Sequence, residues 1–436
     1  MYYLKKKNSD KNLSLQKCLA SRKDCSGKGT HLEINIIKEI CKTTHNADTS
    51  KSIFIVLPDT HDYKGGVYIY NKNGLSFLSD EVKTNYTMEL YPELMAEEPV
   101  PLKELIRVGL TWQYFSLKID SIGLGVSQRA KAPKKINQII NKYTNQNHIL
   151  LYSVVARERN YDLLQEDSSV PLKINLEKDI YLLETPLCYR NRAIYENKYE
   201  GIPLETAIFE KIKKKNLELI TLDDLSQLLW ACQGETDHSS HGNRDNLEKN
   251  GYGRVHASGC AGYAVYPIII VKKPSNLPKG AYFYNPIGFS GLNRWIQVDK
   301  KINYDHYLQK YYDGDLKSEI EKEFNINTSY YLILLCVDRK KPCAGLMQKI
   351  INTKYWAEIE AGMALAGLQL QANALGFSWK KKIISDPNHI KYRNLFQLDL
   401  AEKSINATAK KLLNLPKNNK LTVKGNLSPI ALFYLK

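Results

Sequence analysis

Apolar residues along the chain follow two kinds of pattern, which predict a mixture of helices and strands. An apolar residue every three or four positions indicates helices at residues 36–42 and 221–231, and Thr221 is a favourable N-cap for the second. Short continuous apolar runs indicate buried strands. These runs lie at residues 53–57, 150–155, 266–271, 330–337 and 429–435. Helices and strands mixed in this order predict an α+β or α/β fold.

One alternating segment occurs twice. The segment GVYIYNKNGLS at residues 66–76 recurs without a gap as GAYFYNPIGFS at residues 280–290. Six of the eleven positions are identical, and three more remain apolar. In each copy an alternating strand runs into an Asn and Gly turn and begins to return, which is typical of a β-hairpin.

Two further segments repeat in the same order. Residues 109–123 align without a gap to residues 362–376, and both segments begin and end with glycine and have helical apolar spacing. Upstream, residues 19–24 resemble residues 187–192. Three matches in one order predict a tandem duplication of one domain.

The predicted domains span residues 10–160 and 183–436, and they are unequal. In the second, a strand pattern at residues 330–337 lies between the hairpin and the glycine-bounded helix. The matching interval of the first, residues 77–100, is rich in acidic and polar residues. We therefore expect a degenerate N-terminal copy that lacks this core strand.

Composition places the protein among ordinary globular chains. It is 43% hydrophobic and 25% charged, which is enough to form a packed core. The longest apolar runs fall short of the ~18–20 residues that would cross a bilayer. The first ten residues are charged and lack the apolar run of a signal peptide, and the eight cysteines are dispersed. We expect a cytoplasmic protein with free thiols and no membrane partner.

The net charge of +16 raises the question of a nucleic-acid partner. The lysines are spread along a chain that is also rich in Asn, Ile and Tyr, as the codon usage of an AT-rich genome would produce. We therefore predict no nucleic-acid partner, although this charge would favour an anionic cofactor or an acidic peptide.

Several motifs of the C-terminal half resemble a known family when they are taken together and in order. They are YRNRAIY at residues 189–195, LSQLLWACQG at residues 225–234, RVHASG at residues 254–259 and IEAG at residues 359–362. The set resembles the nitroreductase-like superfamily of FMN flavoproteins, and within it the SagB-type dehydrogenase branch. The resemblance spans nearly the whole C-terminal domain. It implies an α+β fold of two tandem nitroreductase-like domains, each with a central, largely antiparallel sheet flanked by helices.

The resemblance also implies FMN as the cofactor. An arginine fork suits the flavin phosphate, and a glycine lets backbone approach the flat ring. The family builds each flavin site from two domains, so the duplicated chain would form an intrachain pseudo-dimer and would be able to act as a monomer, while further association of chains stays open. The implied cofactor-binding residues are Arg22, Arg190, Asn191, Arg192, Ser258, Gly259, Glu360 and Gly362.

Some positions depart from the family pattern. Asp24 stands where the other copy has Arg192, and Arg107 aligns with Glu360. No serine–glycine loop is recognisable between His45 and Gly65. Each of the two flavin sites that a duplicated chain would form thus lacks some of the family's residues, and the number of flavins per chain stays open.

Three residues are candidates for the base that a flavin-dependent oxidation requires: Lys354, Tyr355 and His256. His238, His241, His256 and Cys260 have a spacing that zinc would allow, but no residues that would orient such ligands are recognisable, and we predict no metal.

The resemblance predicts a flavin-dependent oxidoreductase with a small-molecule or modified-peptide substrate. The SagB-type branch implies oxidation of a peptide-derived azoline heterocycle. A simpler nitroreductase would use NAD(P)H to reduce a small quinone or nitro compound. The alternative is a non-catalytic binding or scaffold protein that retains the fold, which the imperfect motifs favour.

Overall fold

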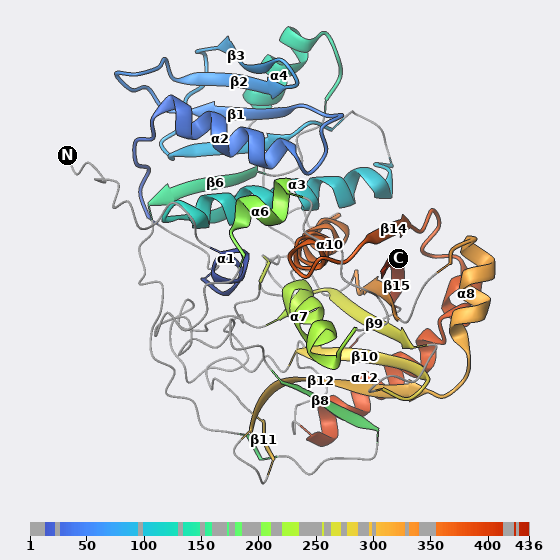
Figure 1. The fold of residues 1–436 in the computed structure, drawn as a ribbon. Helices are drawn as coiled ribbons and strands as arrows, with labels where there is room; N and C mark the ends of the chain where they lie inside the picture. Colours follow the sequence, from blue (N-terminus) through green and yellow to red (C-terminus); the bar gives the residue numbers. More distant parts are fainter. Residues whose placement is uncertain are drawn as a thin grey trace.

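The computed structural model consists of two sheets with helices between and around them (Figure 1). It describes residues 14–21, 27–94, 99–129, 134–148, 153–158, 172–173, 179–184, 202–210, 220–234, 255–256, 263–271, 277–286, 296–298, 302–327, 331–339, 355–412, 423 and 427–435. Within this part of the chain, no helix is long and apolar enough to cross a membrane.

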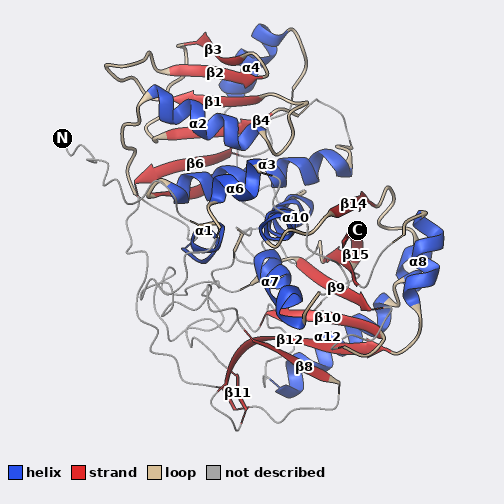
Figure 2. Ribbon diagram, viewed as in Figure 1, coloured by secondary structure: helices blue, strands red, loops and turns tan. Residues whose placement is uncertain are grey.

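The N-terminal sheet has the strand order β3-β2-β1-β4-β6-β5, and every pairing in it is antiparallel. Helices α2 and α3 cover one face, and α4 packs on the other (Figure 2). The bounds are β1 Ile53–Leu57, β2 Gly66–Asn71, β3 Gly74–Ser79, β4 Met88–Pro92, β5 Leu124–Arg129, β6 Ser153–Glu158, α2 Ile34–His45, α3 Leu102–Ser121 and α4 Lys134–Thr144.

The C-terminal sheet has the order β14-β15-β13-β9-β10-β12-β11-β7, with β8 also paired to β12. Its strands are β7 Leu172–Lys173, β8 Ile180–Glu184, β9 Val265–Val271, β10 Gly280–Pro286, β11 Ile296–Val298, β12 Ile302–Tyr312, β13 Tyr331–Val337, β14 Trp379–Ile383 and β15 Ser428–Leu435. The other helices are α1 Leu15–Ser21, α6 Leu204–Phe209, α7 Leu222–Gln233, α8 Leu316–Phe324, α10 Trp356–Ala374, α11 Ile390–Leu395 and α12 Leu398–Leu412. The structure is therefore α+β, with two largely antiparallel sheets.

Six strands of each sheet follow the same order. The N-terminal order β3-β2-β1-β4-β6-β5 matches β12-β10-β9-β13-β15-β14, and all these pairings are antiparallel in both sheets. The matching strands also follow one another in the same order along the chain, and a long helix, α3 or α10, stands before the last two. The two halves thus share one topology.

The strand that we expected the N-terminal half to lack is present, so that prediction was wrong. β4 lies beside β1, in the place that β13 takes beside β9, and all of its residues are buried. Its pattern was missed because Glu89 interrupts the apolar run. The Glu89 carboxylate accepts hydrogen bonds from Thr84 and Tyr91, and these let a charged group lie inside the sheet layer.

Most other sequence predictions of elements are confirmed. The expected strand at residues 53–57 is β1, and the helix at residues 221–231 is α7, where Thr221 and Asp224 form a capping box. The hairpin of the first repeat is β2–β3, with Asn71 opposite Gly74. In the second repeat β10 pairs with β12, which begins only at Ile302, and residues 287–290 of the predicted turn lie outside the described residues.

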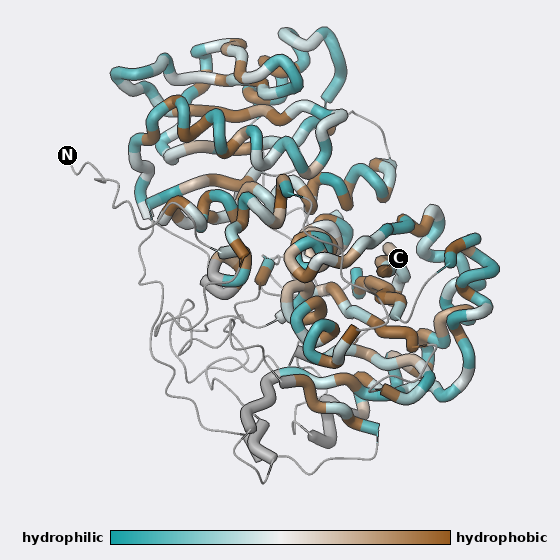
Figure 3. The backbone as a smooth tube through the Cα atoms, viewed as in Figure 1, coloured by the Kyte–Doolittle hydropathy of each residue, from teal (hydrophilic) through white to brown (hydrophobic). Residues whose placement is uncertain are grey.

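Helices α3 and α10 lie against each other between the two sheets (Figure 1). Hydrophobic residues, coloured brown in Figure 3, are frequent along both helices and along the strands of the two sheets, and most of those in α3 and α10 are buried. One core cluster contains residues of α3, such as Leu110 and Leu117, together with residues of α7, α10 and the C-terminal sheet. The two halves are joined by this shared core.

Candidate functional site

Two glycines allow α3 and α10 to touch backbone to backbone. A Cβ added at Gly109 would lie 1.9 Å from the carbonyl oxygen of Ile359, and one added at Gly362 would lie 2.2 Å from that of Ile106. Both distances are far inside van der Waals contact, so neither position has room for a side chain. Gly109 and Gly362 are aligned positions of the sequence repeat, and Ile106 and Ile359 each lie three residues before them. The crossing is therefore reciprocal, as at a two-fold axis.

A group of buried polar residues lies beside this crossing in the C-terminal half. Glu360, in α10, is fully buried, and its Oε1 accepts a hydrogen bond of 2.8 Å from the backbone N–H of Ala264. Ala264 directly precedes β9, and its carbonyl accepts from the N–H of Asp338 at 2.9 Å. A buried carboxylate requires such donors, because desolvation would otherwise disfavour its charge. The Glu360 carboxylate thereby fixes the start of β9 against α10.

His256 is the second member of this buried group. The ring is fully buried, its Nε2 is hydrogen-bonded to Oε1 of Gln233, and its edge packs against the ring of Tyr263. Gln233 ends α7, and its Nε2 donates to the carbonyl of Val265 at 3.0 Å. That bond leaves Oε1 of Gln233 as the acceptor, so Nε2 of His256 carries a hydrogen. In the neutral ring, Nδ1 is then the nitrogen that can take up a proton.

The N-terminal half also contributes to this group. Gln113, in α3, is buried, and its Nε2 donates to the carbonyl of Val255 at 2.8 Å. The N–H of Val255 donates in turn to the carbonyl of Gly234 at 3.1 Å. The segment that carries His256 is thus held from α7 on one side and from α3 on the other. Oε1 of Gln113 is buried and has no hydrogen-bond partner within the described part of the chain.

Tyr355 lies just before α10, at a left-handed φ of 75°. Its hydroxyl accepts a hydrogen bond from the backbone N–H of Val100, at 3.4 Å, and its ring packs against the core of the N-terminal half. Tyr355 therefore packs against the N-terminal half, whereas His256 contacts Gln233 and Tyr263 of the C-terminal half. Gly362 lies at the helix crossing described above. The remaining expected residues lie outside the described residues: Arg22, Arg190, Asn191, Arg192, Ser258, Gly259 and Lys354.

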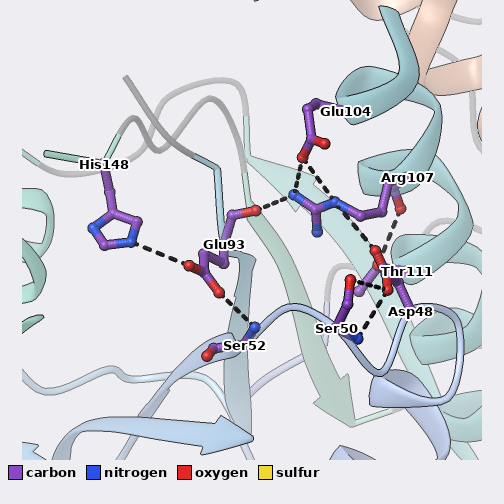
Figure 4. Close-up of polar contacts among 8 residues, drawn as sticks. All are labelled: Asp48, Ser50, Ser52, Glu93, Glu104, Arg107, Thr111 and His148. Carbon is purple, nitrogen blue, oxygen red and sulfur yellow. Dashed lines mark hydrogen bonds and ion pairs between the residues drawn. The ribbon is translucent and has the colours of Figure 1, made fainter. Parts of the chain in front are cut away.

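The N-terminal half has a different polar network at the matching place, with Arg107 at its centre (Figure 4). Arg107 aligns with Glu360, and its side chain is only 8% exposed. It pairs with Glu104 at 3.0 Å and with Asp48 at 3.7 Å, and it donates a hydrogen bond to the carbonyl of Glu93. A buried guanidinium needs these partners, because an unpaired buried charge is strongly destabilising.

The same network continues to Glu93 and His148 (Figure 4). Oε1 of Glu93 lies 3.5 Å from Nε2 of His148, and Oε2 accepts from the N–H of Ser52 at 2.5 Å. Burial opposes the ionisation of Glu93, but its hydrogen bonds from His148 and Ser52 outweigh this effect and lower the pKa of Glu93 to about 2. Glu93 therefore stays ionised at neutral pH and fastens the start of β1 to the end of β4.

The connection that precedes the first central strand also differs between the halves. Residues 46–52 join α2 to β1, whereas residues 234–264 join α7 to β9. Asp48, in the short connection, pairs with Arg107, while the described parts of the long connection supply His256 and Tyr263. Two topologically equivalent places thus carry different chemistry, and the buried group around His256 and Glu360 is the candidate site.

Sequence reasoning noted Gln233 only as part of a motif and missed Gln113 altogether. Both are polar residues within strongly apolar helical segments, LSQLLWACQG and GLTWQYFSLKIDSIG. A buried amide needs hydrogen-bond partners, so such a residue on the apolar face of a helix is the signal that would have identified them.

No protein-family model and no curated protein matches the sequence. Among solved structures, the chain is similar to a proposed nitroreductase from Anabaena variabilis ATCC 29413, with 10% identity and a TM-score of 0.47 over 97% of this chain and 87% of that one. A proposed nitroreductase from Ralstonia eutropha JMP134 has 13% identity and a TM-score of 0.36 over 62% of this chain and 95% of that one. The E. coli microcin synthetase McbBCD complex with truncated pro-MccB17 bound has 11% identity and a TM-score of 0.29 over 52% and 65%. Likenesses at this level do not establish a family or an activity.

Proposed function

We infer that the chain is an FMN-dependent oxidoreductase of the nitroreductase-like fold, close to the SagB-type dehydrogenases, built from two tandem domains that form an intrachain pseudo-dimer. The observation that carries this inference is the buried polar group at the junction of the halves, where α3 and α7 contact Val255 and His256, and α10 contacts Ala264 at the end of the same connection. Of the sequence motifs that resemble the family, LSQLLWACQG contributes Gln233 to this group and IEAG contributes Glu360.

The duplication is supported by the shared order of six strands and by the reciprocal contact of Gly109 and Gly362. The N-terminal copy would serve as a built-in partner. Its own place for a site holds the ion pairs of Arg107, and the short connection at residues 46–52 leaves little chain to cover a cofactor there. We therefore expect one flavin per chain.

Among the described residues, Gln113 offers a buried hydrogen-bond acceptor that suits a flavin. Oε1 of Gln113 is a buried acceptor without a partner in the described part of the chain, and the pyrimidine edge of the isoalloxazine offers an N–H donor. When bound, the flavin supplies the hydride chemistry. Arg190 and Arg192, with Asn191 between them, would hold its phosphate, and Ser258 and Gly259 would let backbone approach the ring. Arg22 is the matching arginine of the N-terminal half.

The protein's own residues would position the reaction and move a proton. Glu360 fixes the backbone N–H of Ala264 at the start of β9, and Gly362 brings α3 against α10. Gln233 orients His256 so that its Nδ1 would accept the substrate proton, while Tyr355 and Lys354 are the other candidates for this role. The substrate would be a peptide-derived azoline, or NAD(P)H would reduce the flavin for a small quinone or nitro acceptor.

The decisive experiment is to purify the full chain and test for flavin. Yellow protein that releases FMN on denaturation is the expected result, and colourless protein that fails to bind added FMN would refute the enzyme and favour the scaffold alternative. In yellow protein, Arg190→Ala should strip the flavin, whereas Lys380→Ala, which removes an exposed charge on β14, should leave the flavin content unchanged. Anaerobic bleaching of the flavin by NADPH, or by an azoline peptide, would distinguish the two substrate classes.

A further inference from the structure

Three residues outside the candidate site bring metal-ligating atoms together. His31 lies just before α2, and His61 and Asp62 lie in the loop between β1 and β2. Nε2 of His31 is 2.9 Å from Oδ2 of Asp62, and Nε2 of His61 is 3.0 Å from Oδ1 of the same carboxylate. One atom from each residue can be chosen so that all three lie within 4.8 Å of one another. Among the described residues, this is the group of His, Cys, Asp and Glu side chains that converges in this way.

The surrounding contacts hold these donors in place. The ring of Tyr63 stacks on that of His31, with centroids 5.8 Å apart and an interplanar angle of 20°. The hydroxyl of Thr60 accepts hydrogen bonds from the N–H groups of Asp62, at 3.2 Å, and Tyr63, at 3.1 Å. The loop that carries His61 and Asp62 is thereby folded back on itself, so an ion would meet donors that are already assembled.

The donor types and spacings suit a transition metal. Zinc binds histidine nitrogen at about 2.0–2.1 Å and carboxylate oxygen at about 2.0–2.2 Å, so neighbouring ligands of one ion lie roughly 3 Å apart. The two separations between a histidine nitrogen and a carboxylate oxygen of Asp62 have this size. The side chains are exposed, so the separation between the two histidine nitrogens can adjust when an ion binds. Side-chain exposures of 34% for His31, 62% for His61 and 36% for Asp62 let water reach the remaining coordination positions.

We propose that His31, His61 and Asp62 bind one divalent transition-metal ion, of which Zn²⁺ is the expected occupant. Imidazole and carboxylate ligands favour such ions over Mg²⁺ and Ca²⁺, which prefer oxygen alone. The ion joins the segment before α2 to the β1–β2 loop. It therefore acts as a clip within the N-terminal half, independent of the proposed flavin site.

The test is metal binding by the full chain after chelator treatment, with Co²⁺ as the probe because its visible bands report on coordination by protein nitrogen. The double variant His31→Ala/His61→Ala should lose one equivalent of bound Co²⁺ relative to the wild type. His389→Ala, which removes another exposed histidine at the start of α11, should retain it. His238, His241 and Cys260 lie outside the described residues and are further potential Co²⁺ ligands. The site is therefore assigned by the difference in bound Co²⁺ between the wild type and the double variant, and not by the total bound to the wild type.

A second variant keeps the result independent of folding. Asp62→Asn preserves the size of the side chain but removes its charge, and it should weaken Co²⁺ binding at least about tenfold. Zn²⁺ should raise the unfolding temperature of the chelated wild type and of His389→Ala, but not that of the double variant. Wild-type stoichiometry and affinity in both cluster variants would overturn the proposal, whether or not the protein carries a flavin.

Discussion

Because Gly109 and Gly362 lie in reciprocal contact, we predict that replacing either of them with alanine destabilises the protein. Gly362→Ala places a methyl group 2.2 Å from the carbonyl oxygen of Ile106, where ordinary contact begins near 3.4 Å. The two helices must therefore move apart by more than about 1 Å. Such a shift would also disturb the edge-to-face contact of Trp112 and Trp356, whose ring centroids lie 5.6 Å apart across the same interface.

The expected magnitude follows from two opposing effects. Overpacking a dense core typically costs about 1–3 kcal/mol, and a backbone clash belongs at the upper end of this range. Alanine is better than glycine inside a helix by up to about 1 kcal/mol, which offsets part of that cost. We expect Gly362→Ala to lower the free energy of unfolding by about 2 kcal/mol, and Gly109→Ala to do the same for the same reason.

Urea unfolding followed by tryptophan fluorescence measures this change, and a double-mutant cycle tests its cause. Once the first methyl has parted the helices, the second finds space, so the Gly109→Ala/Gly362→Ala variant should lose at least about 1 kcal/mol less than the sum of the single losses. Additive losses, or neutral single variants, would refute the reciprocal contact.

Gly367 supplies a matched control on the same helix. A Cβ there would lie 1.9 Å from the carbonyl oxygen of Ala231 in α7, so Gly367→Ala creates an equally severe clash with a different neighbour. Gly367 is five residues beyond Gly362, about 7.5 Å along the axis. Its loss should add to that of Gly109→Ala within about 0.5 kcal/mol, which separates coupling at the crossing from general damage to α10.

Three further predictions concern the polar contacts. Because the pKa of Glu93 is lowered to about 2 in the folded chain, its contribution to stability is present above its ordinary pKa of 4.5 and is lost as the pH falls toward 2. Glu93→Gln should therefore cost up to about 3 kcal/mol at pH 7 and flatten the acid side of the stability curve, which urea titrations from pH 7 to pH 3 would measure; an unchanged slope would contradict the assignment. Thr221→Ala removes the capping box with Asp224 and should lower the free energy of unfolding by about 1 kcal/mol, whereas Thr221→Ser should retain most of it. Gln113→Leu removes the hydrogen bond to Val255, and it should lower the flavin content of the purified protein more than its unfolding midpoint; a loss of stability with full flavin content would make Gln113 purely structural.

Most of the fold could be predicted from local patterns. Continuous apolar runs identified β1, β9, β13 and β15, because buried strands of a layered fold have no polar face to interrupt them. β4 was missed because its burial depends on hydrogen bonds to Glu89, which a hydropathy pattern does not contain. The repeat aligned Gly109 with Gly362, but only the packing of the helices brings these two residues together.

The candidate site was less accessible to prediction from sequence. His256 and Glu360 came from motifs, yet the contacts that fix them, from Gln233 and from the backbone of Ala264, depend on how α7, α10 and β9 meet. His31 and Asp62 are thirty-one residues apart, and nothing in their spacing indicates that a β-hairpin loop returns to the segment before α2. Such clusters are products of tertiary structure.

Because the crossing of α3 and α10 lies within one polypeptide, it folds and evolves differently from the interface of a symmetric dimer. The closure of this crossing is unimolecular, so the crossing itself adds no concentration dependence to the unfolding midpoint, unlike the interface of an obligate dimer. A mutation in α3 or in α10 also changes that helix alone, whereas in a symmetric dimer one mutation would appear in both helices of the crossing. Arg107 and Glu360 occupy aligned positions with opposite charge, and such a pair can arise only where the two sides are encoded separately.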